Sequence, residues 1–445
     1  MMHAPTIKTD VPGPKSRRLI ENAKNVLITT TRLNYIVISK MENDLIWDID
    51  GNVFIDFAAS IAVANIGHRN PKVLEAVRQQ LDKYIHVGPH DWYDELQIEY
   101  AKKLSKVVPG KFEKKIFYGN SGTESVEASL KIARWNTRRP IIIGFYGGFH
   151  GRTYGSLSLT ASKPVHRRHL LPYGLSIHAP YAYCYRCPFR LDKSSCDAWC
   201  GDFIKEWILE KVVPPEDVAA IIMEPMQGEG GYIVPDERFV QKVYKIAKEN
   251  DILFIVDEVQ TGFARSGKMF AIEHFGVVQD IMTTAKSIAN GFPLGATIAR
   301  ADLDFKYEGV HSSTFGGNAI SLAAAIATLD YIIDNRLWER AEKLGNRILG
   351  FLNELKEETE IVGDVRGKGL FIGIEFVRDK YTKEYGVKER DMIEKLCYKH
   401  GLVVLPCGKS TIRIAPPLTI TEEHLEKGLN ILAQVIREVD KSKRG

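Results

Sequence analysis

The sequence has no run of apolar residues close to the roughly 20 that a helix needs to cross a bilayer. Its first residues, MMHAPTIKTDVPGPKSRR, contain no apolar core of the kind that a secretory signal carries. A net charge of +4 over 445 residues gives no reason to expect nucleic acid or an anionic membrane as a partner. We therefore expect a cytoplasmic protein that binds neither membrane nor nucleic acid.

Internal repeats and low-complexity tracts are also absent, and glutamine is scarce, as in many thermophilic proteins. Hydrophobic residues make up 44% of the chain and charged residues 26%, the usual balance of a globular protein. A chain of this length exceeds what one compact core usually serves, so we expect two domains.

Short apolar runs alternate with helical patterns in the region from about residue 110 to about residue 300. The runs are KIFYGN, IIIGF, AAIIMEP, ILFIVDEV, IMTTAK and ATIAR. Strands separated by helices predict an α/β fold with a mostly parallel sheet. Ligands of such sheets bind beyond the carboxyl ends of the strands, and the unusual polar residues of this chain fall at those positions.

The flanking regions have a different pattern. Residues 1–20 lack periodicity and are expected to form an irregular arm. Asp50-Gly51 predicts a hairpin turn, and Asn70-Pro71 predicts the start of a helix. We assign residues 1–60 to an N-terminal segment that joins the small domain, residues 61–325 to the large domain, and residues 326–445 to the C-terminal small domain.

The first strand is followed by YGNSGTES, residues 118–125. Ser121 and Glu124 have the spacing of a capping box at the start of a helix. Gly122 and Thr123 then offer free backbone N–H groups at the positive end of the helix dipole, where a phosphate binds well. An ordinary capped helix would carry the same residues, so this motif gains meaning only from its neighbours.

Four later strand ends carry further polar or aromatic residues. Phe149 in GGFHGRT can stack on a flat ring, and Arg152 can hold a carboxylate with two hydrogen bonds. Glu224 and Asp257 end buried strands, where an unpaired carboxylate is costly. Lys286 ends the fifth strand, facing those acids, which can tune its pKa for Schiff-base chemistry. Each residue alone fits a structural ion pair, but together they supply a phosphate cradle, a stacking ring, a buried acid and a lysine.

The motifs MEPMQGEGG, DEVQTGFARSG, TTAKSIANGFPLGA, HSSTFGGN and VRGKGL resemble, in order and spacing, those of the class-III aminotransferases. These are fold-type I enzymes that use pyridoxal 5′-phosphate. The resemblance covers nearly the whole chain, from DIDGNVFIDFAASIAVANIGHRNPKV to TIRIAPPLTI. It implies a large domain with a mostly parallel seven-stranded sheet and a smaller α+β domain built from both chain ends.

The resemblance implies a role for each residue at the strand ends. Asp257 pairs with the protonated pyridine nitrogen of the cofactor, so the cation expected beside this carboxylate belongs to the ligand, and Glu224 supports that arrangement. Gln260 hydrogen-bonds the ring hydroxyl. Lys286 forms a Schiff base with the cofactor and later moves the substrate proton, while the ring serves as the electron sink.

The same resemblance gives the phosphate to Gly122 and Thr123 and places Phe149 where the family has an aromatic residue stacked on the ring. Thr314, in HSSTFGGN, corresponds to a residue that reaches the phosphate of the neighbouring subunit. The resemblance therefore implies a homodimer with its sites at the subunit interface, alone or paired into a dimer of dimers.

For substrates, the resemblance implies an amino acid donor and a 2-oxo acid acceptor, here 2-oxoglutarate, that react in one pocket. Arg413 corresponds to the arginine that binds the α-carboxylate, and Glu229 to the acid that neutralises it when the reacting end of the donor has no carboxylate. Arg152 corresponds to the binder of the distal carboxylate. Ile61 stands where ornithine-type members tend to carry tyrosine, which favours 4-aminobutyrate over ornithine or lysine as the donor.

Two other functions stay open. Some archaeal members of the family interconvert amino acid enantiomers, and such a racemase needs an acid or a base on each face of the carbanion. Lys286 could supply one and Glu229 the other. A regulator built on an inactive cofactor fold would need a DNA-binding module, for which the basic arm is too short, and the intact lysine argues against it.

Four of the six cysteines lie in one stretch with the spacing C-x2-C-x8-C-x3-C, namely Cys184, Cys187, Cys196 and Cys200. The resemblance gives this insertion no role. The spacing fits a zinc or iron–sulfur site, two nested disulfides of the kind found inside hyperthermophiles, or four reduced core thiols. In each case we expect the stretch to fasten a loop and to take no part in catalysis.

Overall fold

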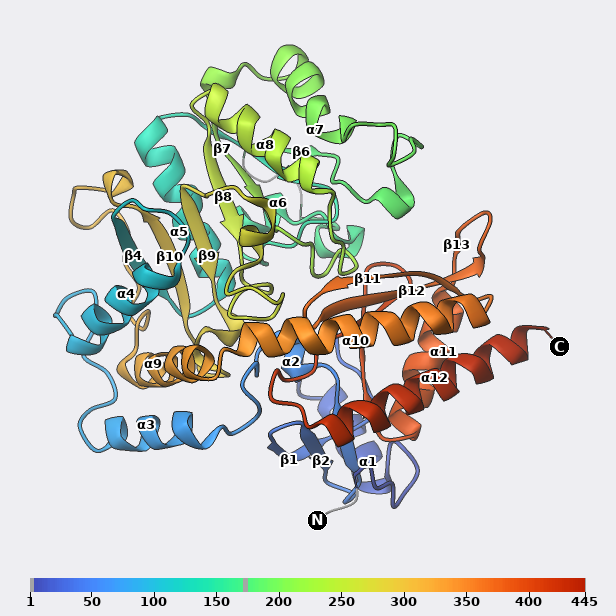
Figure 1. The fold of residues 1–445 in the computed structure, drawn as a ribbon. Helices are drawn as coiled ribbons and strands as arrows, with labels where there is room; N and C mark the ends of the chain where they lie inside the picture. Colours follow the sequence, from blue (N-terminus) through green and yellow to red (C-terminus); the bar gives the residue numbers. More distant parts are fainter. Residues whose placement is uncertain (1–3, 171–174, 445) are drawn as a thin grey trace.

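A large, mostly parallel sheet forms the centre of one half of the molecule (Figure 1). The computed structural model of the chain describes residues 4–170 and 175–444. Seven strands run in the order β4-β10-β9-β8-β7-β5-β6. Their bounds are β4 (Lys114–Gly119), β5 (Ile141–Phe145), β6 (Ser176–Ala179), β7 (Val218–Met223), β8 (Leu253–Asp257), β9 (Ile281–Thr284) and β10 (Gly295–Arg300). Every neighbouring pair is parallel except the two that include β10, so the predicted fold class is confirmed.

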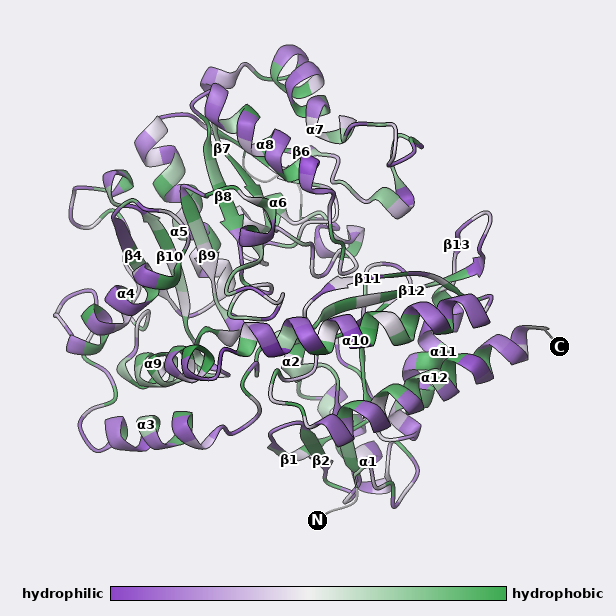
Figure 2. Ribbon diagram, in the orientation of Figure 1, coloured by the Kyte–Doolittle hydropathy of each residue, from purple (hydrophilic) through white to green (hydrophobic). Residues whose placement is uncertain are grey.

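Helices cover both faces of this sheet because its central strands are buried on both sides. All residues of β7 and β8 are buried, and Figure 2 shows both strands as hydrophobic. Ile255 lies in the apolar layer of α5, whereas the next residue, Val256, lies in the layer of α8. The helices of this half are α2 (Ala59–Ala62), α3 (Pro71–Leu81), α4 (Glu95–Val107), α5 (Gly122–Thr137), α6 (Tyr154–Leu159), α7 (Trp199–Phe203), α8 (Glu237–Glu249) and α9 (Ala319–Asp334).

The two chain ends build the other half together. A four-stranded sheet has the order β1-β2-β3-β14, and its last strand comes from the C-terminal region and runs parallel to β3. A second sheet has the order β11-β12-β16-β15, with β13 paired to β12. The strands are β1 (Ile38–Glu42), β2 (Leu45–Asp48), β3 (Val53–Asp56), β11 (Val362–Lys368), β12 (Phe371–Asp379), β13 (Glu384–Tyr385), β14 (Leu402–Val403), β15 (Leu405–Cys407) and β16 (Thr411–Ile414). The helices are α1 (Pro14–Lys24), α10 (Leu337–Glu358), α11 (Val387–Lys399) and α12 (Glu422–Arg444).

Local signals in the sequence are confirmed at several element ends. The side chain of Asn70 caps α3 by accepting from Lys72 N at 3.0 Å, and the chain turns between β2 and β3 at Gly51, which has a φ of +87°. The expectation of an irregular arm over residues 1–20 is wrong, because α1 begins at Pro14. Asp50, beside the hairpin turn, accepts hydrogen bonds from the first backbone N–H groups of this helix, and a cap from so distant a residue leaves no local signal.

The short edge strand β6 has no counterpart among the six predicted runs. Its sequence, SIHA, alternates polar and apolar residues, and three of the four are half-buried, so it contains no apolar run. Helix α9 spans residues 319–334, so the expected boundary between residues 325 and 326 falls inside it. The division into residues 1–60, 61–325 and 326–445 stays a prediction. Among the described helices, none combines the length and the apolar character needed to traverse a bilayer.

Candidate active site

A cavity of about 420 Å³ opens at the carboxyl ends of the parallel strands. Eight of the predicted residues line it: Gly122, Thr123, Phe149, Arg152, Glu224, Asp257, Gln260 and Lys286. They follow β4, β5, β7, β8 and β9, or end them. The topology of the sheet thus brings distant positions of the chain together at one site, as its strand ends predict, and the roles of the residues stay predictions.

The start of α5 forms one wall of the cavity. Ser121 caps the helix by accepting from Glu124 N at 3.3 Å, and Glu124 accepts in return from Asn120 N at 2.5 Å. This is the predicted capping box with its return bond moved by one residue. Gly122 fits where a larger residue would not, because a Cβ there would lie 2.8 Å from a methyl group of Val259. Gly122 and Thr123, in the first turn of the helix, line the cavity, and the start of a helix is where an anion binds well.

Asp257, at the end of β8, is only 3% exposed. Its Oδ2 accepts from His150 Nδ1 at 2.8 Å, and its Oδ1 accepts from Val259 N at 3.0 Å. Burial disfavours the imidazolium of His150, but the hydrogen bond and the charge of Asp257 outweigh burial and raise the pKa of His150. A protein side chain thus pairs with Asp257 as well, and the expected pairing of Asp257 with the pyridine nitrogen of the cofactor stays a prediction.

Glu224 follows β7 and ties two loops of the site together. Its Oε1 accepts from Phe149 N and its Oε2 from Gly228 N, both at 2.8 Å. Burial raises the pKa of Glu224 to about 7, against the opposing charge of His150. The carboxyl group is therefore close to balance between its two protonation states at neutral pH, and its hydrogen bonds fix the loop that carries Phe149.

Lys286 lies two residues after the last residue of β9, Thr284, and has an unusual backbone conformation. Its φ of +47° lies in the left-handed region, which is rarely occupied by residues other than glycine and is costly for them. Burial lowers the pKa of its amine to about 8, although the charges of Asp257 and Glu224 act in the opposite direction. An amine with this pKa is partly neutral near pH 7, which a nucleophilic lysine requires.

Two further observations show that the cavity suits a flat, polar ring. The Oε1 atom of Gln260 is buried and has no hydrogen-bond partner among the described residues. Such orphaned atoms are rare in folded proteins, and the amide can present either its oxygen or its nitrogen to a ligand. Phe149 is held at the cavity by His166, whose ring lies edge-to-face at 5.6 Å. These residues fit the phosphate, ring and carbonyl of pyridoxal phosphate.

A cluster of charges that does not line the cavity contains the predicted pair of Glu229 and Arg413. Glu229 Oε2 lies 3.0 Å from Arg413 Nη2, and Glu229 Oε1 lies 2.6 Å from Lys163 Nζ. Burial would raise the pKa of Glu229, but the charges of Arg413 and Lys163 outweigh it and lower that pKa. Nε and Nη1 of Arg413 are buried without a hydrogen-bond partner among the described residues. A buried guanidinium with two unpaired donors is suited to a carboxylate.

Ile61 and Thr314 also lie outside the cavity lining. Ile61 is 45% exposed and has a φ of +68°, within a left-handed turn formed by all four residues of α2. A β-branched residue in this region is a conformational outlier. Thr314 is exposed in a loop whose neighbouring Ser313 accepts from Asn120 Nδ2 at 3.2 Å. Both predicted residues therefore lie at the surface of the single chain.

His150 and Lys163 are the polar residues of the site that sequence reasoning missed. His150 lies within the GGFHGRT motif, next to the predicted Phe149, but nothing in the motif indicates a partner far along the chain. Lys163 lies in ASKPVHRR, where three cationic residues close together read as an ordinary solvated stretch. The position of His150, next to the predicted stacking residue Phe149, is the one feature of the sequence that could have indicated a role for it.

Comparisons with known proteins agree with this geometry. The family model described as "Aminotransferase class-III" matches residues 28–436. A probable 4-aminobutyrate aminotransferase of Bacillus subtilis is 40% identical, with 89% of this chain and 92% of the relative covered. A leucine/methionine racemase of Thermococcus litoralis is 38% identical, with 97% of this chain and 98% of the relative covered.

Solved structures give the same result. A thermostable (S)-enantioselective omega-transaminase from Thermomicrobium roseum superposes with a TM-score of 0.87 at 30% identity, covering 96% of this chain and 98% of that one. An aminotransferase of Bacillus anthracis has a TM-score of 0.86 at 29% identity, covering 97% of this chain and 100% of that one.

Proposed function

Because the chain belongs to the class-III aminotransferases, which use pyridoxal phosphate, we propose that it moves the ω-amino group of 4-aminobutyrate, or of a related ω-amino acid, to 2-oxoglutarate. The observation that carries this proposal is the contact between Glu229 and Arg413 at 3.0 Å, with two donors of Arg413 left over. The charge of this guanidinium is neutralised by Glu229, and its two unpaired N–H groups can still donate to the carboxylate of a substrate. Such a group suits a pocket that binds two kinds of substrate in turn.

When bound, pyridoxal phosphate supplies a carbonyl group for the amine and a ring that accepts electrons. The first turn of α5, with Gly122 and Thr123, would hold the phosphate. Phe149 would stack on the ring, and Gln260 would hydrogen-bond the ring hydroxyl. The Oε1 of Gln260, unpaired among the described residues, and the close packing at Gly122, where a Cβ would lie 2.8 Å from Val259, support this arrangement.

Asp257 would hold the ring nitrogen in its protonated state. His150 donates to one oxygen of this carboxylate and Val259 N donates to the other, so the carboxylate has one fixed orientation. Lys286 would bond to the cofactor carbonyl and, once released, hold at Nζ the proton removed from the substrate. Its lowered pKa lets Nζ both take up and return that proton near neutral pH.

Glu229 would respond to the two substrates in different ways. The reacting end of an ω-amino acid carries no carboxylate, so Glu229 stays on Arg413 and keeps it neutralised. The α-carboxylate of 2-oxoglutarate instead needs Arg413 for itself. Glu229 then retains Lys163 at 2.6 Å as its partner, so the exchange leaves no buried charge unpaired.

Arg152 would bind the carboxylate at the far end of both substrates. Its side chain is exposed at the edge of the cavity, with the guanidinium carbon 5.5 Å from the ring centre of Phe149. A distal carboxylate therefore meets a cation at the entrance while the amine reaches Lys286 inside.

A homodimer would complete the site. Large apolar side chains remain exposed on the single chain, including Trp92, Tyr93 at 96% and Phe315. The ring of Phe315 lies against that of His86, with the ring centres 5.0 Å apart and the planes tilted by 36°, which brings the segment around residue 90 next to the loop of Thr314. Exposed aromatic groups that cluster in this way mark a protein interface, and a second copy would bring its Thr314 to the phosphate.

Racemisation is the second candidate, because a racemase relative matches almost the full length of both chains. In that reaction Glu229 would serve as the second acid or base. The two cations beside it argue otherwise, since they lower its pKa and leave its carboxylate a poor proton donor.

The deciding experiment measures each half-reaction in single turnover. Enzyme in its aldehyde form is mixed with one donor alone, and enzyme in its amine form is mixed with 2-oxoglutarate. Arg413→Ala should slow the 2-oxoglutarate half-reaction at least about tenfold and largely spare the ω-amine half-reaction, because a doubly hydrogen-bonded charged contact contributes roughly 1.5–3 kcal/mol. Glu229→Gln should have the reverse effect.

A racemase would give a different pattern. Arg413→Ala would then weaken the binding of every α-amino acid, and Glu229→Gln would slow the return of the proton to one face of the carbanion only. Optical rotation would fall without conversion of the cofactor to its amine form. Equal damage to both half-reactions by Arg413→Ala would count against the proposed exchange of carboxylates.

A further inference from the structure

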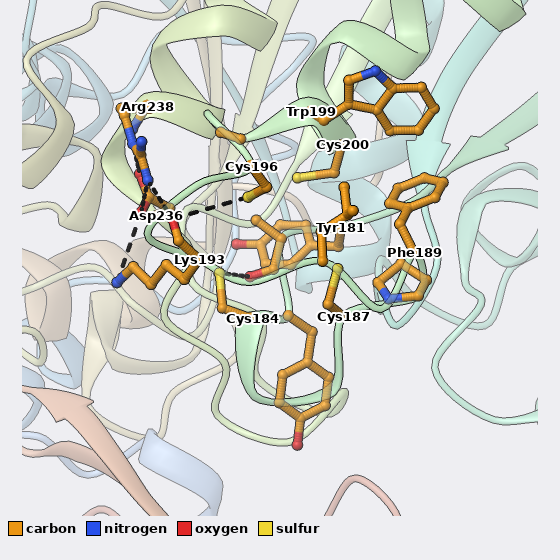
Figure 3. A pocket seen from close by; sticks show the side chains of 15 residues that line it. Tyr181, Cys184, Cys187, Phe189, Lys193, Cys196, Trp199, Cys200, Asp236 and Arg238 are labelled. Atoms are coloured by element: carbon orange, nitrogen blue, oxygen red, sulfur yellow. Dashed lines mark hydrogen bonds and ion pairs between the residues drawn. The ribbon is translucent and has the colours of Figure 1, made fainter.

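The four clustered cysteines surround one small cavity that is separate from the active site. Cys184, Cys187, Cys196 and Cys200 all line a space of about 20 Å³. Figure 3 shows the sulfur atoms of Cys196 and Cys200 on one side of it and those of Cys184 and Cys187 on the other. That volume suits a single water-sized occupant. All four side chains are free thiols in the structure, so each is available as a ligand.

The four thiols lie near one another, because all of them line the same small cavity. Four thiolates packed together would repel one another strongly unless a cation lay among them. Lys193 and Arg238 line the same cavity. Asp236 also lines it and pairs with both cations, so together these three side chains would offset only part of the net −2 of a divalent cation held by four thiolates.

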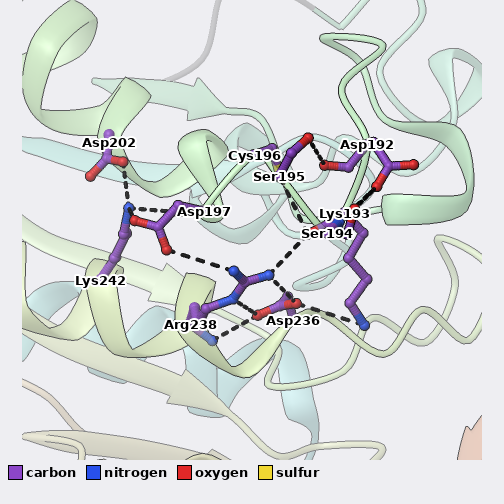
Figure 4. Close-up of polar contacts among 10 residues, drawn as sticks. All are labelled: Asp192, Lys193, Ser194, Ser195, Cys196, Asp197, Asp202, Asp236, Arg238 and Lys242. Atoms are coloured by element: carbon purple, nitrogen blue, oxygen red, sulfur yellow. Dashed lines mark hydrogen bonds and ion pairs between the residues drawn. The ribbon is translucent and has the colours of Figure 1, made fainter.

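The segment that carries these cysteines has few other means of keeping its shape. After η2 (Cys184–Arg186), the fully described stretch forms no regular element until α7 begins at Trp199. Figure 4 shows how ion pairs tie it to α8, where Asp197 and Asp202 contact Lys242. The Asp197 side chain is 76% exposed, and such surface pairs contribute only about 0–1 kcal/mol each. Beyond these pairs the stretch has one small aromatic cluster, in which Phe189 lies edge-to-face on Trp199 at 4.6 Å. A bound metal would therefore add the strongest cross-link in this loop.

We propose that Cys184, Cys187, Cys196 and Cys200 form a structural zinc site that closes residues 184–200 into a rigid unit. The C-x2-C and C-x3-C pairs have the spacing that such sites use, and four thiolates suit tetrahedral zinc with Zn–S bonds of about 2.3 Å. Among residues 4–170 and 175–444, no group of three or more His, Cys, Asp or Glu side chains is already drawn together to hold a metal ion. The four thiols would therefore turn inward on binding, release four protons and form four Zn–S bonds.

The rigid unit would stabilise a junction between the two halves of the molecule. Tyr183 precedes Cys184, and Arg186 follows it by two residues. Both side chains donate hydrogen bonds to Glu375 of β12. The guanidinium of Arg186 also lies 3.6 Å from the ring centre of Tyr385 in β13. Zinc would thus act on the order of this segment and not on the chemistry at Lys286, so the proposal holds whichever reaction the enzyme catalyses.

The test begins with the full-length enzyme purified without chelator. Elemental mass spectrometry gives zinc per chain, and thiol titration after denaturation without reductant gives the number of free cysteines. Cys187→Ala and Cys196→Ala remove a ligand, and Cys397→Ala is the control because Cys397 is buried elsewhere, in α11. We expect about one zinc per chain and six titratable thiols in the parent protein, with zinc retained by the control. Each ligand variant should lose zinc affinity by more than about tenfold.

A second readout keeps the test decisive even where a variant folds poorly. Treating the parent protein with a strong chelator should lower its melting temperature and speed proteolytic cleavage between residues 187 and 196, and added Zn²⁺ should reverse both effects. Only two titratable thiols would show two disulfides and overturn the proposal. The visible absorption of an iron–sulfur cluster, or six free thiols that bind no added Zn²⁺, would overturn it as well.

Discussion

The rate at which cofactor-free enzyme reacts with pyridoxal phosphate should rise with pH, reach half its maximum near pH 8 and level off about one pH unit higher. In the proposed role, Lys286 would attack the cofactor carbonyl only as the neutral amine, and burial lowers the pKa of this amine from an ordinary 10.5 to about 8. At pH 7 about a tenth of an amine with a pKa of 8 is neutral, against about 0.03% of an ordinary lysine. The expected advantage in rate at pH 7 is therefore about 300-fold.

The assay is stopped-flow absorbance of the cofactor after mixing with apoenzyme, over the range from about pH 6 to about pH 10. Lys286→Ala is the control, because it keeps the phosphate and ring contacts and should show non-covalent binding without the pH-dependent step. Asp257 raises the pKa of Lys286 in the parent enzyme, so Asp257→Asn should move the plateau to lower pH. A plateau beyond pH 10, or covalent attachment to another lysine after borohydride reduction, would refute the assignment.

Three further outcomes follow from the same contacts. Asp257→Asn should slow removal of the substrate proton in single turnover by orders of magnitude while cofactor affinity changes little, because the shape remains and the charge beside the ring nitrogen is lost. Glu258, the residue after Asp257, is fully buried, and its Oε1 accepts from Ile272 N at 2.7 Å. Burial raises the pKa of Glu258 to about 7, so its contribution to stability is full below about pH 4.5 and is lost as pH rises through 7. Glu258→Gln should therefore flatten that part of the curve of melting temperature against pH. Lys163→Met should weaken the binding of 2-oxoglutarate about fivefold and leave the binding of the ω-amine donor unchanged. The reason is that a partly exposed pair at 2.6 Å contributes roughly 1 kcal/mol to holding the displaced Glu229. Equal effects on both substrates would count against this role of Lys163.

The strand ends of the large sheet could be predicted from sequence because each carries a local signal. An apolar run that stops at an acid, a lysine or a glycine-rich turn indicates both a buried strand and a polar residue at the carboxyl edge of the sheet. The parallel topology then brings Glu224, Asp257 and Lys286 to the same edge without any further information. Eight predicted residues line one cavity for this reason.

The contacts between those residues could not be predicted, since they depend on pairs far apart in the chain. Nothing local connects His150 with Asp257, or Lys163 with Glu229, although both pairs are closer than 3 Å. The left-handed turn at Ile61 is hidden in the same way, because its four residues include no glycine to indicate it. Asp56 holds that turn from outside by accepting from Ala58 N and Ala59 N, a constraint that a propensity argument does not contain.

The charges of the site explain why a buried strand can end in a carboxylate before any ligand arrives. Asp257 pairs with His150 at 2.8 Å, and Glu229 pairs with Lys163 and Arg413. These two carboxylates therefore have protein partners in the empty site. Lys286 has no such close partner and responds by a lowered pKa. Each protein cation therefore does for the empty site what a ligand group would do in the filled one. The pyridine nitrogen would add to His150 at Asp257, and a substrate carboxylate would replace Glu229 at Arg413. Asp257 and Glu229 can thus meet and release charged molecules repeatedly while each keeps at least one protein partner of its own.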